Sequence, residues 1–312
     1  MSTDIHDVIM IGAGPSALAA AIYTTREDIE TVLYEKAVIG GLAAITDKVD
    51  NYPGFPDGVE GMALAGDLEK QAERFGAKVE FGQADALRDE GDVKVVTIDG
   101  KEVKAKTVLI ATGSDYKKVG VPGEAEFYGR GVHYCATCDG AYYRGKRLVV
   151  IGGGNSAYQE ALFLTRYASH IDILARSTIK ASDVLQHDMQ KHIDEGKVTV
   201  HLNTSTEEIV ATDGKVTSVR ATKDGKETSF ETDGVFVFVG LIPNTQFLEG
   251  SGVELDERGM VKTNLKLATN ISGVFASGDV RSGATEQIAS AVGEGATAAL
   301  SIREYLDEQN RT

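Results

Sequence analysis

Two glycine-rich turns constrain the fold of this chain more than any other feature of its sequence. Each stands between an apolar segment and a segment rich in small residues, at Gly12–Ala17 (GAGPSA) and at Gly152–Ala157 (GGGNSA). Glycines in this pattern allow a tight turn from strand to helix and let the backbone approach a pyrophosphate closely. The sequence therefore predicts two nucleotide-type βαβ units in an α/β fold with doubly wound parallel sheets.

The first unit has the order that a dinucleotide fingerprint requires. We expect a strand over Asp7–Ile11, a helix over Ser16–Thr25 and a second strand over Thr31–Tyr34. Glu35 ends that second strand, about 20 residues beyond the glycines, where an acid can accept hydrogen bonds from ribose hydroxyls. Ala17 replaces the third glycine of the pattern, which is allowed because this position needs only a small side chain.

The second turn repeats this order and divides the chain. We predict a first domain at 1–115 that is completed by 245–312, and a second domain at 116–244 that is inserted into it. Two segments are expected to be β-rich, a hairpin at Lys94–Val103 and an excursion at Val198–Glu231. The other expected elements are strands at Thr107–Ala111, Arg147–Ile151, Ile171–Leu174, Val235–Val239 and Gly273–Ser277, and helices at Ser156–Tyr167 and Gln287–Leu300.

Both cysteines of the chain fall in one motif, Cys135-Ala136-Thr137-Cys138-Asp139, between the two glycine turns. In a large chain such a pair is more often catalytic or metal-binding than part of a disulfide framework. A zinc site would need two further ligands at matching spacing, and only His133 is near, so no metal is predicted. His133 itself is expected to be a core or surface histidine rather than a proton shuttle. The motif indicates a redox-active dithiol.

Composition narrows the possible partners. The formal net charge of −15 argues against nucleic acids and anionic membranes as partners. No apolar run approaches the roughly 18–20 residues that span a bilayer. The N-terminus is polar and acidic without a basic region, so a secretory signal is not expected and a cytoplasmic location is.

The order of these elements resembles that of the low-molecular-weight thioredoxin reductases, over essentially the whole chain. The motif CATCDG, followed by RGK and a GGG turn, is specific among flavoproteins with two dinucleotide folds. The stretches that carry the resemblance are Gly12–Ala17, Gly40-Gly41, Asn51–Gly54, Ala111–Gly113, Cys135–Gly140, Gly152–Ala157, Gly278-Asp279 and Gln287.

The resemblance implies that the first domain binds FAD. It places Glu35 at the adenosine ribose, Asp279 at the ribitol chain and Gln287 at the flavin ring. This chain departs from the family at Leu42, where a glutamine is usual, so a donor to the flavin is lost or replaced. The residues implied to hold FAD are Gly12, Gly14, Pro15, Ser16, Glu35, Lys36, Gly40, Gly41, Leu42, Asn51, Ala111, Thr112, Gly113, Gly278, Asp279 and Gln287.

The resemblance also assigns roles at the dithiol. Cys138 faces the flavin, Cys135 attacks the disulfide of a thioredoxin-type protein, and Asp139 handles the proton. The thiolate is the nucleophile in such an exchange, and a helix start lowers the pKa of a thiol. Members of the family are usually homodimers, so a homodimer is expected.

The identity of the electron donor is the property that the sequence constrains least. The resemblance implies NADPH at Gly154, Asn155 and Ser156, with Arg176 and Lys180 near its 2′-phosphate. Ser177 replaces a usual arginine, and a lysine offers a point charge instead of a bidentate fork. Two donors are therefore left open, NADPH and a non-pyridine donor such as ferredoxin.

Two other functions compete with disulfide reduction. A flavin-dependent dithiol oxidase would run the same parts in reverse, from a substrate dithiol through flavin to oxygen. A redox-inactive flavin-binding or regulatory protein would leave the CxxC without use. Ferredoxin–NADP reductases of similar layout lack the CxxC, so Cys135 and Cys138 argue against them.

Overall fold

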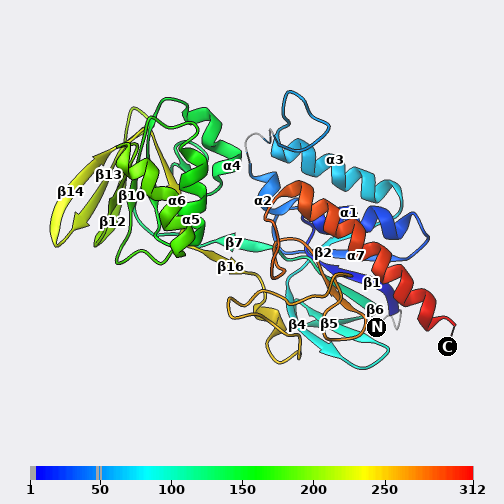
Figure 1. Ribbon diagram of the computed structural model, residues 1–312. Helices are drawn as coiled ribbons and strands as arrows, with labels where there is room; N and C mark the ends of the chain where they lie inside the picture. Colours follow the sequence, from blue (N-terminus) through cyan, green and yellow to red (C-terminus); the bar gives the residue numbers. More distant parts are fainter. Residues whose placement is uncertain (1–4, 47–48, 50, 312) are drawn as a thin grey trace. The chain divides into compact units, whose positions relative to one another are not determined.

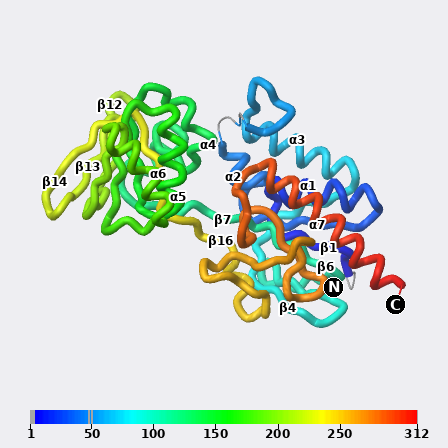
Figure 2. The backbone as a smooth tube through the Cα atoms, viewed as in Figure 1, coloured from blue at the N-terminus to red at the C-terminus, as the bar shows by residue number. Residues whose placement is uncertain are grey.

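The computed structural model describes residues 5–46, 49 and 51–311, and it confirms the α/β class. The chain divides into two compact units, the first formed by Met1–Asp115 with Ile242–Thr312 and the second by Tyr116–Leu241. Figure 2 shows that the first unit contains both the blue N-terminal and the red C-terminal segments. The chain returns to the first unit at Ile242, whereas the sequence pattern placed this return at 245.

A seven-stranded sheet forms the centre of the first unit (Figure 1). β1 pairs in parallel with β2 and with β6, β2 pairs in parallel with β3, and β17 pairs in parallel with β6. β4, β5 and β6 form an antiparallel meander, because Asp99-Gly100 turns the chain between β5 and β6 as expected. The strands are β1 (Ile5–Ile11), β2 (Thr31–Glu35), β3 (Lys78–Phe81), β4 (Ala84–Asp89), β5 (Lys94–Ile98), β6 (Lys101–Ile110) and β17 (Val274–Ala276).

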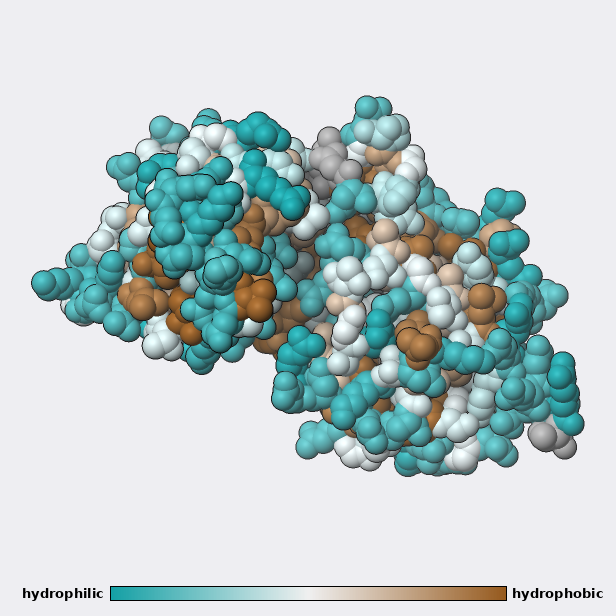
Figure 3. Space-filling view, in the orientation of Figure 1, coloured by the Kyte–Doolittle hydropathy of each residue, from teal (hydrophilic) through white to brown (hydrophobic). Residues whose placement is uncertain are grey.

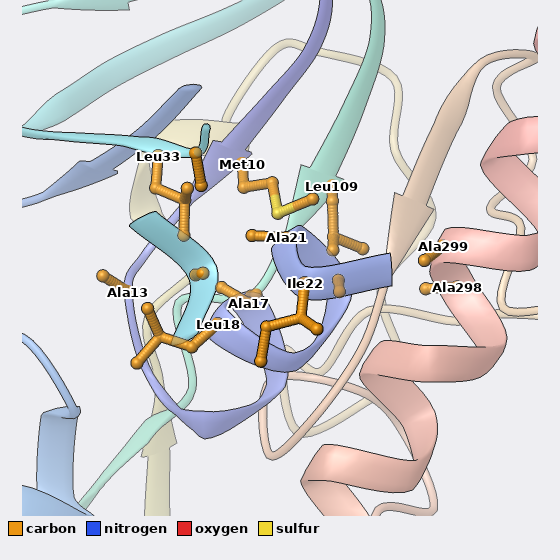
Figure 4. Packing of buried hydrophobic residues seen from close by; sticks show 14 of the residues in the cluster. Met10, Ala13, Ala17, Leu18, Ala21, Ile22, Leu33, Leu109, Ala298 and Ala299 are labelled. Carbon is orange, nitrogen blue, oxygen red and sulfur yellow. The ribbon is translucent and has the colours of Figure 1, made fainter. Parts of the chain in front are cut away.

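Helices α1, α3 and α7 pack on one face of this sheet. Strand β1 alternates between the two faces, so Val8 and Met10 join the core under the helices while Ile9 and Ile11 join the core of the opposite face. Figure 4 shows Ala298 and Ala299 on α7 and Ala17 and Ala21 on α1, which belong to one buried cluster. The helices are α1 (Pro15–Thr25), α2 (Gly41–Ala44), α3 (Gly61–Arg74), α7 (Ile288–Gln309) and the 3₁₀ turn η2 (Gln246–Leu248).

The second unit contains a five-stranded parallel sheet in the order β11-β10-β9-β15-β8 and an antiparallel sheet β12-β13-β14. The β-rich excursion expected from Val198 starts later, at Thr204, because Val198–His201 joins the parallel sheet beside β10. The strands are β8 (Val132–His133), β9 (Arg147–Ile151), β10 (His170–Leu174), β11 (Val198–His201), β12 (Thr204–Thr212), β13 (Lys215–Lys223), β14 (Lys226–Glu231) and β15 (Gly234–Val237). The helices are α4 (Ala136–Asp139), α5 (Asn155–Leu164), α6 (Asp183–Asp194) and the 3₁₀ turn η1 (Gly140–Tyr143).

The two crossings between the units pair with each other as β7 (Ser114–Tyr116) and β16 (Leu241–Pro243). Backbone hydrogen bonds extend this ribbon on both sides, from Lys117 N–H to the Gly240 carbonyl at 3.0 Å and from Asn244 N–H to the Gly113 carbonyl at 3.1 Å. The chain therefore leaves and re-enters the first unit at neighbouring points.

Hydrophilic side chains cover most of the surface of each unit on the face shown in Figure 3. Among the residues that the structure describes, no helix is long and apolar enough to cross a lipid bilayer.

The contact between α1 and α7 gives a first prediction. A Cβ atom at Gly295 of α7 would lie 2.1 Å from the Ser16 carbonyl oxygen, whereas a Cβ at Gly293 would meet no atom within 4 Å. We expect Gly295→Ala to lower the free energy of unfolding by about 1–3 kcal/mol, because the helices must move apart. Denaturant unfolding of the purified protein measures this change.

Gly293→Ala is the matched control on the same helix. It should leave stability unchanged or raise it by about 0.5–1 kcal/mol, since alanine favours a helix over glycine. Equal stability of the two variants would contradict the close contact between α1 and α7.

Candidate functional site

At the first glycine turn, two segments of the backbone, at Gly12 and at Ala111, are in direct contact. Gly12 has φ +99°, and a Cβ atom there would lie 2.5 Å from the Ala111 carbonyl oxygen, so only glycine fits. At Gly14 a Cβ atom would meet nothing within 4 Å, which leaves the backbone open to a ligand. Helix α1 begins at Pro15, and no side chain caps its N-terminus. Its first N–H groups are therefore available to an anion such as a pyrophosphate.

The Glu35 carboxylate is fixed beside this turn. Its Oε2 accepts a hydrogen bond from Ala13 N–H and its Oε1 accepts one from Ala37 N–H, each at 2.9 Å. Each carboxylate oxygen keeps lone pairs that can accept ribose hydroxyls. The prediction that an acid ends β2 next to the glycines is thus met by the geometry.

A pocket of about 310 Å³ opens on the first unit at these residues. It is large enough for part of a dinucleotide. Among the residues implied by the resemblance, Gly12, Glu35, Lys36 and Thr112 line it; its other walls are Ile11, Tyr34, Gly82, Gln83, Ala84, Asp85, Asn244, Gln246 and Phe247.

A second pair of glycines lies against the first turn. Gly40 N–H donates a hydrogen bond to the Ala13 carbonyl at 2.8 Å. A Cβ atom at Gly41 would lie 3.9 Å from the Gly14 Cα, so the two turns are in contact. Leu42 follows in the short helix α2 and presents no polar side chain where the family usually has a glutamine.

Residues far apart in the sequence meet near the start of α7. Asn51 Nδ2 donates a hydrogen bond to Gln287 Oε1 at 3.1 Å, and Gln287 is the residue before the first turn of α7. A Cβ atom at Gly278 would lie 3.1 Å from the Ser16 Cβ, so the Gly278-Asp279 pair lies against the start of α1. The structure thus brings these four implied residues to the same end of the first unit as the glycine turns.

Asp279 lies among other acids. Burial, together with the charges of Glu286 and Glu294, raises the pKa of the Asp279 carboxyl from 3.8 to about 6. Glu294 itself accepts hydrogen bonds from Gly278 N–H at 2.8 Å and from Arg281 Nε at 3.1 Å. Asp279 can therefore accept or donate a hydrogen bond to a ligand hydroxyl, depending on pH.

Sequence reasoning missed Asn244. Thr112 Oγ1 donates to the Asn244 carbonyl at 2.7 Å, and Asn244 Nδ2 donates to the Thr112 carbonyl at 3.0 Å. These bonds tie the predicted segment Ala111–Gly113 to the returning chain after Pro243. No spacing rule reveals such a pair, because 132 positions separate the two residues.

The cysteine motif belongs to the second unit. Cys135 and Cys138 form a disulfide, and both are partly exposed. Cys135 precedes α4, where its Sγ accepts a hydrogen bond from Cys138 N–H at 3.2 Å. Ala136 N–H donates to Glu160 Oε2 at 3.2 Å. Helix α4 is a single turn, so its dipole contributes little and side chains must set the thiol chemistry.

Asp139 has a buried basic neighbour. His133 Nδ1 lies 3.2 Å from Asp139 Oδ2, and His133 is 6% exposed. On the other side of the imidazole, Nε2 lies 2.7 Å from the Tyr143 hydroxyl. The sequence left a core and a surface placement open for His133; the structure places it in the core, and its contact with Asp139 was not foreseen.

The second glycine turn repeats the geometry of the first. A Cβ atom at Gly152 would lie 2.3 Å from the Phe238 carbonyl oxygen, whereas one at Gly154 would meet nothing within 4 Å. Asn155 Oδ1 accepts a hydrogen bond from Ser182 N–H at 2.8 Å, which fixes the loop that carries Arg176 and Lys180. Both cations are exposed, as is Ser156, and neither forms an ion pair with a residue that the structure describes.

The chain is similar to known proteins over nearly its whole length. The family model described as pyridine nucleotide-disulphide oxidoreductase matches residues 6–295. A thioredoxin reductase of Bacillus subtilis (strain 168) is 42% identical over 311 residues, which are 99% of this chain and 97% of that protein. The solved thioredoxin reductase from Streptococcus pyogenes MGAS5005 has a TM-score of 0.91 at 35% identity, covering 98% of this chain and 100% of that one. The one from Giardia duodenalis has a TM-score of 0.90 at 29% identity, covering 97% and 100%.

Two dinucleotide-type units, one of them with a CxxC disulfide, define an oxidoreductase, and the chain belongs to the pyridine nucleotide-disulphide oxidoreductase family. Within that family it is a member of the low-molecular-weight thioredoxin reductases, which confirms the resemblance drawn from the sequence.

The pKa of Asp279 predicts how stability depends on pH. Because the folded protein holds the proton up to about pH 6, the free energy of unfolding should fall as pH rises from about 4 to about 6, by as much as about 3 kcal/mol. Asp279→Asn removes this loss and should be more stable than the original protein above pH 6. Urea unfolding of FAD-stripped protein at several pH values measures the difference.

The exposed Asp92→Asn is the control, and its pH dependence should match that of the original protein. An Asp279→Asn protein that still loses the same stability between pH 4 and 6 would show that another group carries the effect.

Proposed function

We propose that this chain is a thioredoxin reductase-like flavoenzyme that passes electrons through Cys135 and Cys138 to the disulfide of a thioredoxin-type protein. The observation that carries the proposal is the partly exposed Cys135–Cys138 disulfide beside Asp139, on a unit whose own glycine turn is open. The relatives named thioredoxin reductase support it, since they match nearly the whole chain.

The first unit, 1–115 with 242–312, is proposed to bind FAD. The open backbone at Gly14 and the free N–H groups of α1 suit its pyrophosphate, and Glu35 suits its ribose. Lys36 would lie along the pocket, Gly40–Leu42, Asn51 and Ala111–Gly113 beside the ring system, Asp279 at the ribitol and Gln287 at the flavin. When bound there, FAD would supply the redox chemistry that delivers an electron pair to the Cys135–Cys138 disulfide.

The dithiol then acts by thiol–disulfide exchange. The Cys135 thiolate attacks one sulfur of the partner's disulfide, and the other partner sulfur leaves as a thiolate. Cys138 then attacks Cys135 of the mixed disulfide, which releases the partner's second thiolate and restores the intramolecular disulfide. The Asp139 carboxylate accepts the proton from Cys138, because only the thiolate is nucleophilic.

The second unit, 116–241, is proposed to bind NADPH as the electron donor. The open backbone at Gly154 can receive its pyrophosphate, and the unpaired cations Arg176 and Lys180 can contact its 2′-phosphate. Because Ser177 supplies no charge, these residues are expected to bind the 2′-phosphate more weakly than three arginines would. A non-pyridine donor such as ferredoxin is the alternative. A homodimer is proposed as the working form.

The test is anaerobic mixing of the oxidised protein with NADPH, NADH, reduced ferredoxin or reduced thioredoxin, each alone, while flavin absorbance is followed. Bleaching by NADPH at low concentration, and then reduction of added thioredoxin, is the expected result. Bleaching by ferredoxin alone would reassign the donor. Oxygen consumption with a small dithiol, without thioredoxin reduction, would identify a dithiol oxidase instead.

Cys138→Ser should abolish thioredoxin reduction, because neither flavin reoxidation nor release of the mixed disulfide can then proceed through the pair. Flavin bleaching by the electron donor should be unchanged, and this serves as the internal control for folding and FAD binding. Thioredoxin reduction at the normal rate by this variant would exclude the proposed path.

Arg176→Ala should raise the KM for NADPH about 10-fold, the equivalent of about 1.4 kcal/mol for a lost charged hydrogen bond. The KM for NADH should not change, because NADH lacks the 2′-phosphate. The control is Lys226→Ala, which removes an exposed cation from β14 of the same unit. An equal rise for both nucleotides would argue against contact with the phosphate.

A further inference from the structure

Three side chains of the second unit, Asp139, His133 and Tyr143, form a connected line that starts at the dithiol motif. Asp139, directly after Cys138, lies with Oδ2 3.2 Å from His133 Nδ1. His133 Nε2 lies 2.7 Å from the Tyr143 hydroxyl. An imidazole can take up a proton at one ring nitrogen while releasing one from the other. The line therefore has the connectivity of a proton relay.

Packing fixes this line in place. The rings of His133 and Tyr143 meet edge to face, with centroids 5.3 Å apart, and both pack on Phe236. Tyr143 occupies the space beside Gly234, where a Cβ atom would lie 2.3 Å from the Tyr143 Cε1. His133 is buried, whereas Asp139 and Tyr143, at the two ends of the line, are both partly exposed, so the imidazole connects two groups that reach solvent.

The tyrosine stays protonated in this environment. Burial, followed by the charges of Asp139 and Asp233, raises the pKa of Tyr143 to about 12. A neutral hydroxyl can accept a proton from the imidazole and release its own, so it conducts a proton without carrying a charge for long.

Although the sequence argued against a proton shuttle at His133, these contacts favour one, and we propose that His133 and Tyr143 carry protons between Asp139 and solvent while Cys138 closes the disulfide with Cys135. This inference rests on the proposed function. His133 acts through Asp139, so it is a positioning and relay residue and does not touch the reacting sulfurs.

The same transfers apply to any disulfide partner. The Cys138 thiol gives its proton to Asp139, its sulfur bonds to Cys135, and the bond from Cys135 to the partner sulfur breaks to release a thiolate. The Asp139 proton passes to His133 Nδ1, the Nε2 proton passes to the Tyr143 oxygen, and the Tyr143 proton leaves. One proton enters and one leaves, and Asp139 is an acceptor again. His133 is left with its proton on Nδ1, and the reverse transfer, which returns a proton to Cys138 when the disulfide is next reduced, restores the proton on Nε2.

Other ionisable groups surround the line and contribute to its pH dependence. Burial and then the charge of Asp139 raise the pKa of Tyr128. Asp233 acts on Tyr143 through its charge, and Glu160 accepts the hydrogen bond of Ala136 N–H at the start of α4. His133 differs from these groups in contacting both Asp139 and Tyr143 directly.

The test follows a single closure of the disulfide. The full-length flavoprotein is reduced with dithiothreitol, freed of excess thiol without oxygen and mixed with a dithiobis(nitrobenzoate) probe in a stopped-flow instrument. The first coloured thiolate reports attack by Cys135, and the second reports closure by Cys138. We expect His133→Asn to slow closure about 10-fold, part of the about 100- to 10,000-fold that a positioned proton-transfer group contributes. The rate of the first attack should not change.

Asparagine can still donate a hydrogen bond toward Asp139 but cannot relay a proton, so this variant separates the relay from mere positioning. The slowing should depend on pH, come with a changed solvent isotope effect, and be relieved by free imidazole in His133→Gly. Tyr143→Phe should slow closure with the same isotope signature. The controls are His170→Asn, which alters another His–Asp pair of this unit, and Tyr158→Phe, which alters another buried tyrosine.

Closure at the original rate in both His133→Asn and Tyr143→Phe would overturn the proposal. So would a loss that is the same at every pH and in heavy water. The probe needs no nicotinamide and no thioredoxin, so the rate of disulfide closure can be measured even if the proposed function is wrong. If the original protein closes its disulfide with the probe but does not reduce thioredoxin, the proposed function is contradicted, and the effect of the His133 and Tyr143 variants on closure can still be interpreted.

Discussion

Direct contact between backbones is the constraint on which the first unit depends. Gly12 lies against the Ala111 carbonyl, and Gly295 of α7 lies against the Ser16 carbonyl of α1. With no side chains between them, the β1–α1 turn, the end of β6 and helix α7 are held at fixed separations. The alanines along α1 and α7 serve the same end, since they let the helices approach. The backbone at Gly14 is open, whereas the backbones at Gly12 and Gly295 are in close contact with their neighbours.

Asp279 in the first unit and Asp139 in the second have different chemical properties because their neighbours differ. Burial, together with the nearby charges of Glu286 and Glu294, makes ionisation of Asp279 costly and leaves it able to donate or accept a hydrogen bond. Asp139 instead lies 3.2 Å from the imidazole of His133, a group that can donate or accept a hydrogen bond. The single turn of α4 adds little electrostatic help, so the chemistry of the cysteines depends on these side-chain neighbours.

The sequence predicted most reliably what is local. The glycine turns, Glu35 at the end of β2 and the Asp99-Gly100 turn follow from patterns within a few residues, and the structure contains all of them. Helix α7 runs to Gln309, beyond the expected Leu300, because Ile302 and Leu306 continue its buried face.

Contacts between distant segments were harder to predict. Asn51 and Gln287 were placed at one site only through family resemblance, since 236 positions separate them. The contact of Asn244 with Thr112 and that of Asp139 with His133 leave no periodicity or spacing in the sequence by which they could be predicted. They depend on how strands far apart in the sequence come to lie side by side, which only the folded chain settles.

The pairing of β7 with β16 has a consequence for how such a chain can change over time. Because Asp115 and Ile242 flank one small ribbon, a few residues could join them without rethreading the main sheet. The inserted unit is in this sense a cassette. Its loss or exchange would leave the topology of the other unit intact, so a different second unit could be acquired in one recombination event.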